Sequence, residues 1–355
     1  MTATRPPRSP GKVRAARLTD LAALGELSRL CQSDDPTTRS LGLPVSGPPI
    51  GVFSLFRLPL GAFRPNDLMY VYEEGGRIAG LVRVERESTR DEWTIVELDA
   101  VGMADAGDIR YRLVNQLLRE GAKRGAARFH VACADADGNV DLMMQAGFIR
   151  YGEEQIMFRR ATLELPEPWS DKAARDARIR PTQAIDALAL HRLYTAATPG
   201  PVARLEALRL PDWERQGDHS RVPRSSLAPI LRFADIEAFV QASKDGGKDG
   251  TILDGFVQVG VAKEDQPHYL KVLVRPEADP SALIAFGLGI IEARTSKGGE
   301  HRHDHGVIAP VRTYEAPLDA RLEDAAFDTV ANVTLLMKET LVRVAEPALV
   351  PAGVR

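Results

Sequence analysis

The chain has 355 residues, of which 44% are apolar, and its 46 Lys and Arg residues nearly balance 49 Asp and Glu residues, giving a net charge of −3. This length exceeds one typical hydrophobic core and suits two cores of about 150 residues each. The near-neutral charge argues against a general attraction to nucleic acid or to an anionic membrane, and no apolar run reaches the ~18 residues that span a bilayer.

The N-terminal residues and the two cysteines indicate a cytoplasmic protein. Residues 1–11 are rich in Pro and Arg and lack the apolar segment of a signal peptide, so we expect a disordered tail. Cys31 and Cys133 lie far apart in the sequence and form neither a disulfide framework nor a metal clip. We expect both to be small buried residues in a reducing compartment.

Residues 12–161, called here the first repeat, alternate between strand-like and helix-like patterns. The turn at 73–76 separates two apolar runs and predicts a β-hairpin. Apolar residues at helical spacing over 108–124, followed by Gly125, predict a helix with a defined end. Residues 33–66 predict no defined element. In chain order, strands are expected at 13–17, 68–72, 77–85, 94–101, 127–133 and 148–159, and helices at 21–30, 108–124 and 139–146.

Residues 178–355, the second repeat, follow a proline-bearing linker at 162–177 and show a similar order of elements. Both repeats end their last helix with a small residue and Phe, at Gly147-Phe148 and at Ala326-Phe327. This recurrence predicts a duplicated α/β fold, with a mixed sheet flanked by helices in each repeat. Strands are expected at 177–181, 255–262, 269–274, 307–311 and 334–342, and helices at 182–193, 280–295 and 318–325.

The element order resembles the GNAT superfamily of acyl-CoA-dependent N-acetyltransferases, in a tandem arrangement. The stretches that carry the resemblance are the hairpin 70–85, the strand–loop–helix unit 98–125 and the ending 143–148, with Val274-Arg-Pro-Glu and 322–327 in the second repeat. The resemblance covers nearly the whole chain. It implies two tandem GNAT-like α/β folds with mixed sheets, acetyl-CoA as the cofactor and a small-molecule amine as the substrate.

In that family a glycine-rich loop after the fourth strand holds the CoA pyrophosphate, because its backbone N–H groups and the following helix N-terminus face the anion. Here the three glycine positions are Ala106, Asp108 and Arg110, and the equivalent stretch of the second repeat contains Pro280, which has no N–H. Helix capping therefore explains both stretches better than phosphate binding. The cofactor positions implied by the resemblance are Ala100, Val101, Gly102, Gly107, Asp108, Ile109, Arg110 and Asn139.

Glu97 and Asp99 are the candidate catalytic residues. They lie two apart on a predicted strand, so both side chains point to one face. The resemblance implies that a carboxylate on this strand takes the proton from the amine. The alternative is a structural role, such as pairing with Arg83 across the hairpin. The positions of the tyrosine that many relatives use as the general acid hold Met143 and Leu322.

Other candidate residues favour structural roles. Asn139 precedes a short helix and fits an N-cap as well as a cofactor contact. His301, His303 and His305 lie between a predicted helix and strand, where an exposed loop is expected, and no Cys or carboxylate frame completes a metal site. We therefore expect no bound metal.

Two functions remain open from the sequence. The first is a cytoplasmic, bacterial-type N-acetyltransferase that moves an acyl group from acyl-CoA to an amine, with the first repeat as the active half. The second is a catalytically inactive GNAT-fold protein that binds a ligand or acts as a scaffold. Neither involves nucleic acid or a membrane, and the oligomeric state is not specified by the sequence.

Overall fold

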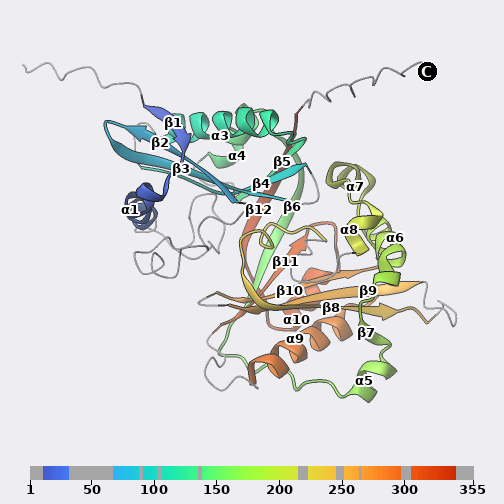
Figure 1. Ribbon diagram of the computed structural model, residues 1–355. Helices are drawn as coiled ribbons and strands as arrows, with labels where there is room; N and C mark the ends of the chain where they lie inside the picture. Colours follow the sequence, from blue (N-terminus) through green and yellow to red (C-terminus); the bar gives the residue numbers. More distant parts are fainter. Residues whose placement is uncertain are drawn as a thin grey trace, which may run out of the picture.

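The computed structural model describes residues 11–31, 67–87, 91–101, 106–134, 138–214, 223–244, 252–263, 266–296 and 305–340. These residues form one mixed, strongly twisted sheet with helices on both of its faces (Figure 1). The stretch 33–66, for which the sequence predicts no element, lies outside the described residues.

The elements of the first repeat follow the predicted order. They are β1 (Lys12–Ala15), α1 (Leu21–Cys31), β2 (Asp67–Glu74), β3 (Arg77–Arg86), β4 (Glu92–Ala100), α3 (Ala106–Lys123), β5 (Arg128–Ala134), α4 (Asn139–Gln145) and β6 (Ile149–Arg159). The predicted hairpin is confirmed as β2 and β3, joined at Gly75 and Gly76, whose positive φ values of 56° and 78° suit glycine.

The linker and the second repeat contain elements that the sequence pattern does not predict as well as those that it does. They are α5 (Asp171–Asp176), β7 (Ile179–Pro181), α6 (Ala187–Ala197), α7 (Gly200–Glu206), α8 (Leu210–Glu214), β8 (Phe233–Ala242), β9 (Leu253–Ala262), β10 (His268–Val274), α9 (Ser281–Ser296), β11 (Val307–Arg312), α10 (Leu318–Asp324) and β12 (Asp328–Glu339). The missed elements are α5, within the predicted linker, together with α7, α8 and β8.

The order of strands in the sheet has an internal two-fold symmetry. The order is β1-β2-β3-β4-β5-β12-β6-β11-β10-β9-β8-β7. Replacing each strand by its counterpart in the other repeat, β1 by β7 and so on to β6 by β12, gives the same order reversed. The described residues therefore carry the duplication that the sequence pattern predicts.

The two repeats exchange their last strands at the centre of the sheet. β12 lies between β5 and β6, and β6 lies between β12 and β11. The repeats therefore share one sheet, so the expectation of a separate sheet in each repeat is wrong. The domain boundary at 162–177 remains a prediction, because the shared sheet runs across both repeats.

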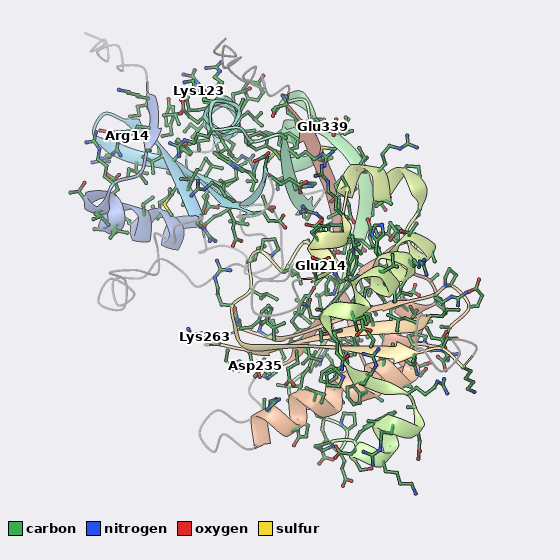
Figure 2. The ribbon with its side chains drawn as sticks, turned by 45° about the vertical axis from the view of Figure 1, so that its right-hand side comes forward. Arg14, Lys123, Glu214, Asp235, Lys263 and Glu339 are labelled. Carbon is green, nitrogen blue, oxygen red and sulfur yellow. The ribbon has the colours of Figure 1, made fainter. Side chains whose placement is uncertain are left out.

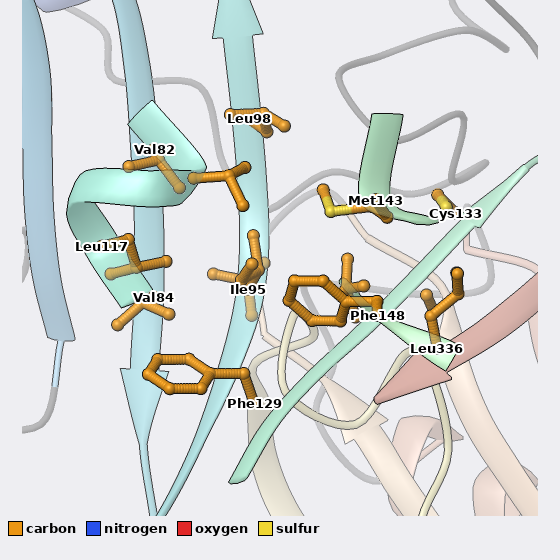
Figure 3. Close-up of a cluster of buried hydrophobic side chains, with 14 of the residues drawn as sticks. Val82, Val84, Ile95, Leu98, Leu117, Phe129, Cys133, Met143, Phe148 and Leu336 are labelled. Carbon is orange, nitrogen blue, oxygen red and sulfur yellow. The ribbon is translucent and has the colours of Figure 1, made fainter. Parts of the chain in front are cut away.

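Helices cover both faces of the first repeat (Figure 1). On one face, Leu24 and Leu27 of α1 pack against Val71 and Leu81. On the other face lies the larger core beneath α3, of which Figure 3 shows Leu117 with Val82, Val84, Ile95 and Leu98. Tyr70, Tyr72 and Trp93 are buried, as the sequence predicts for aromatic residues on strands.

A partly buried arginine–aspartate pair recurs at the start of each repeat. In the first, Arg14 (Figure 2) donates two hydrogen bonds to Asp20, of 2.6 and 2.9 Å. In the second, Arg180 donates two of 2.7 Å to Asp186. Each aspartate also accepts a backbone N–H from the third residue before it. None of the helices in the described ranges is long and apolar enough to cross a membrane.

Candidate functional site

The pairing of two parallel strands in the first repeat ends before the strands themselves do, and the stretch beyond their last pair is the candidate cleft. β4 and β5 pair from Glu92–Arg128 to Ile95–Val131, but both strands continue, to Ala100 and Ala134. Beyond the last pair, the facing edges of β4 and β5 carry backbone N–H and C=O groups that do not hydrogen-bond between these two strands. The opening lies at the carboxyl ends of both strands, beside the N-termini of α3 and α4.

The two candidate carboxylates lie two residues apart on β4 and share one face, and a β-bulge just before them sets which face that is. Arg83 pairs with Glu97 while the next residue of β3 pairs with Ile95, so Val96 is the extra residue. Ile95 and Leu98 consequently face the core beneath α3. Glu97 and Asp99 face the opposite side, where α1 ends at Cys31.

Glu97 and Asp99 have different surroundings. The Arg83 Nε donates a hydrogen bond of 2.7 Å to Glu97 Oε2, and both side chains are partly buried. This is the pairing that the sequence analysis gave as the structural alternative. Asp99 is buried, at 7% exposure. Burial, together with the Asp99 and Glu97 charges, raises the pKa of the half-buried Cys31 thiol to about 12.

The helix N-termini beside the cleft are linked by one side-chain hydrogen bond. Arg110 Nη1, near the N-terminus of α3, donates to Asn139 Oδ1, at the start of α4, over 2.7 Å. The structure thus brings together two of the cofactor positions implied by the resemblance. Asp108 instead pairs with Arg112 over 2.7 Å on the exposed side of α3.

The N-cap expectation for Asn139 is wrong. Gly138 occupies the N-cap position with φ of 66°, and the Asn139 side chain is buried and accepts the Arg110 hydrogen bond. In the second repeat the capping prediction is confirmed, because Asp279 Oδ1 accepts hydrogen bonds from Ser281 N and Oγ, of 3.2 and 2.7 Å.

The remaining cofactor positions line the end of β4 and the start of α3. Ala100 ends β4, and the Val101 N–H donates to Ala79 O over 3.0 Å, which continues the pairing with β3. Ile109 is buried against the sheet, whereas Gly107 has open space around it. Gly102 lies outside the described residues.

Comparison with solved structures decides the fold. A tandem GNAT protein from the clavulanic acid biosynthesis pathway, solved without acetyl-CoA, aligns over 93% of this chain and 98% of its own, with 14% identity and a TM-score of 0.56. A GCN5-related N-acetyltransferase from Sphaerobacter thermophilus aligns over 93% and 95%, with 15% identity and a TM-score of 0.53. No family model matches the sequence, and no curated protein matches it.

The chain has the tandem GNAT fold. This confirms the fold class inferred from the element order. The positions at which the resemblance implies a general acid, Met143 and Leu322, are both buried, at 0 and 1% exposure. A thioether and an aliphatic side chain at these positions cannot donate a proton.

A buried ionic cluster that the sequence analysis missed lies at the other end of β4 and β5 from the cleft. Glu92 on β4 pairs with Arg224 of the second repeat, and its carboxylate lies 3.3 Å from His130 Nε2 and from Arg128 Nη1. Arg224 also pairs with Glu87 over 3.0 Å. This cluster joins the second repeat to β4 through the Arg224 contacts with Glu92 and Glu87, which span 132 and 137 residues of sequence and so leave no local signal.

The described residues contain no group of three or more His, Cys, Asp and Glu side chains placed to hold a metal ion. His305 is the one member of the histidine-rich stretch inside the described ranges, and its ring lies 6.1 Å from that of His268. His301 and His303 lie outside those ranges.

Proposed function

We propose that this GNAT-fold protein transfers an acyl group from an acyl-CoA to an amine, in the cleft of the first repeat. The observation that carries the proposal is the end of the β4–β5 pairing at Ile95–Val131, with Glu97 and Asp99 on the part of β4 that continues beyond it. A cleft between diverging parallel strands suits an extended thioester arm, because unused backbone groups can pair with its amides.

The cleft residues can also divide the tasks of binding and proton transfer. The N-terminus of α3, with Arg110 in the turn that follows, favours a phosphate-bearing ligand at the cleft mouth. The cofactor would supply an acyl group activated as a thioester. Glu97 would accept the proton of the attacking amine, and Arg83 would orient its carboxylate through the 2.7 Å hydrogen bond.

A pair of matched variants tests the catalytic role. Thiol release from acetyl-CoA would be followed with a panel of amines for the wild type, Glu97→Gln and Asp99→Asn. Loss of a positioned base lowers the rate about 10²–10⁴-fold, so we expect that loss for Glu97→Gln. Asp99→Asn removes a charge from the same face and should cost much less. Equal activity of Glu97→Gln and wild type, with the fold intact by circular dichroism, would remove Glu97 from the mechanism.

A non-catalytic ligand-binding or scaffolding role is the second candidate. Two observations favour it: Glu97 already has an arginine partner, and Met143 and Leu322 cannot act as the general acid. Calorimetric titration with acetyl-CoA separates the possibilities. Binding with turnover supports the transferase, and micromolar binding, about −8 kcal/mol, without turnover on any amine supports the ligand-binding role. Absence of binding favours the scaffold.

A further inference from the structure

The internal symmetry assigns the residues of β4 that follow its bulge counterparts on β10. Gly80 and Gly255 are equivalent, since a Cβ at either would collide with the first turns of α3 and α9. Gly80 pairs with the last residue of β4 and Gly255 with the last residue of β10. The residues three positions after these glycines, on β3 and on β9, pair with Glu97 and with Lys271 respectively. Lys271 therefore takes the place of Glu97 in the second repeat.

The second repeat has the same divergence of parallel strands. β10 and β11 pair at His268–Val307 and Tyr269–Ile308, and then continue to Val274 and Arg312. Lys271 lies two residues beyond the last pair, which is where the strands separate. By backbone alone, the second repeat would offer a cleft like that of the first.

The Lys271 side chain fills this divergence. Its ammonium donates to Pro310 O on β11 over 3.2 Å, and to both carboxylate oxygens of Glu315 over 3.0 and 2.8 Å. The Lys271 and Glu315 side chains are both buried, at 1% and 7% exposure. The amine therefore bridges β10 to β11 across the gap into which an acyl arm would have to pass.

A second layer of buried charges fixes this bridge. The Arg312 backbone N–H donates to Glu315 Oε2 over 2.9 Å. The Arg312 guanidinium contacts Glu206 over 2.9 Å and Glu154, from β6 of the first repeat, over 3.2 Å. Opening the gap would separate charges that are removed from water, which is strongly unfavourable for either partner left alone.

The first repeat has a different arrangement at the equivalent position. Glu97 turns toward Arg83 on β3, within its own hairpin, and not toward β5. Ala134 at the end of β5 is the counterpart of Arg312 at the end of β11. Ala134 pairs with Val333 and Arg312 pairs with Glu154, and Val333 and Glu154 are equivalent positions of β12 and β6. The buried ion pair of Arg312 with Glu154 thus has uncharged counterparts, Ala134 and Val333, in the first repeat.

We propose that Lys271 closes the cleft of the second repeat, so that the chain has one acyl-CoA site, in the first repeat. The second repeat then serves as a structural partner, which supplies β12 to the edge of β5 and Arg224 to Glu92. The number of acyl-CoA sites rests on the proposed function, whereas the closure of the second cleft by Lys271 does not.

Lysine reactivity tests the closure without any ligand. The native protein would be reductively methylated with formaldehyde, and each lysine followed by peptide mass spectrometry. Lys123, near the outer end of α3 (Figure 2), is 70% exposed and serves as the reference. We expect Lys271 to react at least about 100-fold more slowly, because reaction requires local opening. A rate within tenfold of that of Lys123 overturns the closure.

Calorimetry with acetyl-CoA tests the number of sites. Wild type and the double variant Lys271→Met with Glu315→Gln would be titrated, the second change avoiding an unpaired buried carboxylate. We expect one site per chain and unchanged affinity in both. Two sites in the wild type, or an affinity change above tenfold in a folded variant, overturns the proposal. If acetyl-CoA binds neither protein, the proposed function and the site count fail together, while the lysine reactivity still decides the closure.

Discussion

His130 is buried between charged groups of both repeats. Its Nε2 lies 3.3 Å from Glu92, its ring packs edge-on against Tyr151 at 6.2 Å, and Arg224 bonds to the same Glu92 carboxylate. Burial, reinforced by the Arg224 charge and opposed by Glu92, lowers the pKa of His130 to about 4. The folded protein therefore holds this imidazole neutral across the physiological range.

The lowered pKa predicts a loss of stability in mild acid. Between pH 6.5 and pH 4 the unfolded chain binds a proton at His130 and the folded chain does not, so the free energy of unfolding falls as the pH falls. For this group the loss at pH 5 is about 2 kcal/mol relative to pH 7. Urea denaturation at pH 7 and at pH 5 measures the free energy of unfolding. Between these pH values His130→Gln should lose about 2 kcal/mol less of it than the wild type. Equal losses in variant and wild type would contradict the pKa shift.

Asp108 places a negative charge in the first turn of α3, where a phosphate of the cofactor would approach. Removing it with Asp108→Asn should tighten acetyl-CoA binding by about 0.5 kcal/mol, roughly twofold, because a charge near a helix terminus contributes on that scale. Calorimetry at low salt measures the effect. Arg112→Gln is the control, since it breaks the same exposed ion pair without removing the negative charge. Equal tightening in both variants would point to the ion pair instead.

In this chain, the sequence pattern predicts a side-chain contact of the candidate site only where the two residues lie on neighbouring strands. The Arg83–Glu97 contact could be foreseen because a hairpin places these residues on adjacent strands. The Arg110–Asn139 contact could not, because it joins the ends of two helices across 29 residues. The prediction of Asn139 as an N-cap is wrong because Gly138 takes the N-cap position instead. The backbone there has a positive φ, which glycine adopts readily.

At the scale of elements, the distance between α3 and β3 depends on Gly80. A Cβ at this position would lie 2.5 Å from Ile109 Cγ2 and 3.2 Å from Asp99 O, on α3 and β4 respectively. The β-branched Ile109 has little freedom to move on a helix. The glycine thus lets the N-terminal turn of α3 approach the sheet beside the cleft.

Gly80→Ala should therefore destabilise the protein by about 1–3 kcal/mol, as overpacking of a close contact does, and should weaken acetyl-CoA binding as α3 moves outward. Gly107→Ala is the matched control, because nothing lies within 4 Å of the added methyl group. In that helical position alanine should be neutral or stabilising by up to about 1 kcal/mol. Thermal denaturation of both variants measures the difference, and equal stabilities would contradict the close approach.

The sequence predicted the elements with strong periodicity and missed those without it. The helix of α3 and the hairpin of β2 and β3 were found because their apolar residues recur regularly. β8 was missed because most of its residues are only partly buried, so its apolar alternation is weak. A stronger sign of duplication was available in the pairs Arg14 with Asp20 and Arg180 with Asp186, six residues apart in each repeat.

At the scale of the whole molecule, the exchange of β6 and β12 could not be read from the sequence. The same alternating pattern suits a strand that pairs within its own repeat and one that pairs with the other, since only long-range contacts distinguish them. The exchange has a structural consequence, because β12 pairs with β5 and β6 while β6 also pairs with β11. The repeats are therefore interleaved rather than placed side by side.

Interleaving predicts that cutting the linker will not separate the repeats. A protease recognition sequence inserted between Ala161 and Thr162, just after β6, would allow cleavage of the folded protein. We expect the two fragments to elute together in size-exclusion chromatography under native conditions, because each would have to withdraw a strand from the middle of the sheet. Addition of urea should release both fragments in the same transition that unfolds the sheet. Fragments that separate in native buffer and keep their circular dichroism would show instead that each repeat folds on its own.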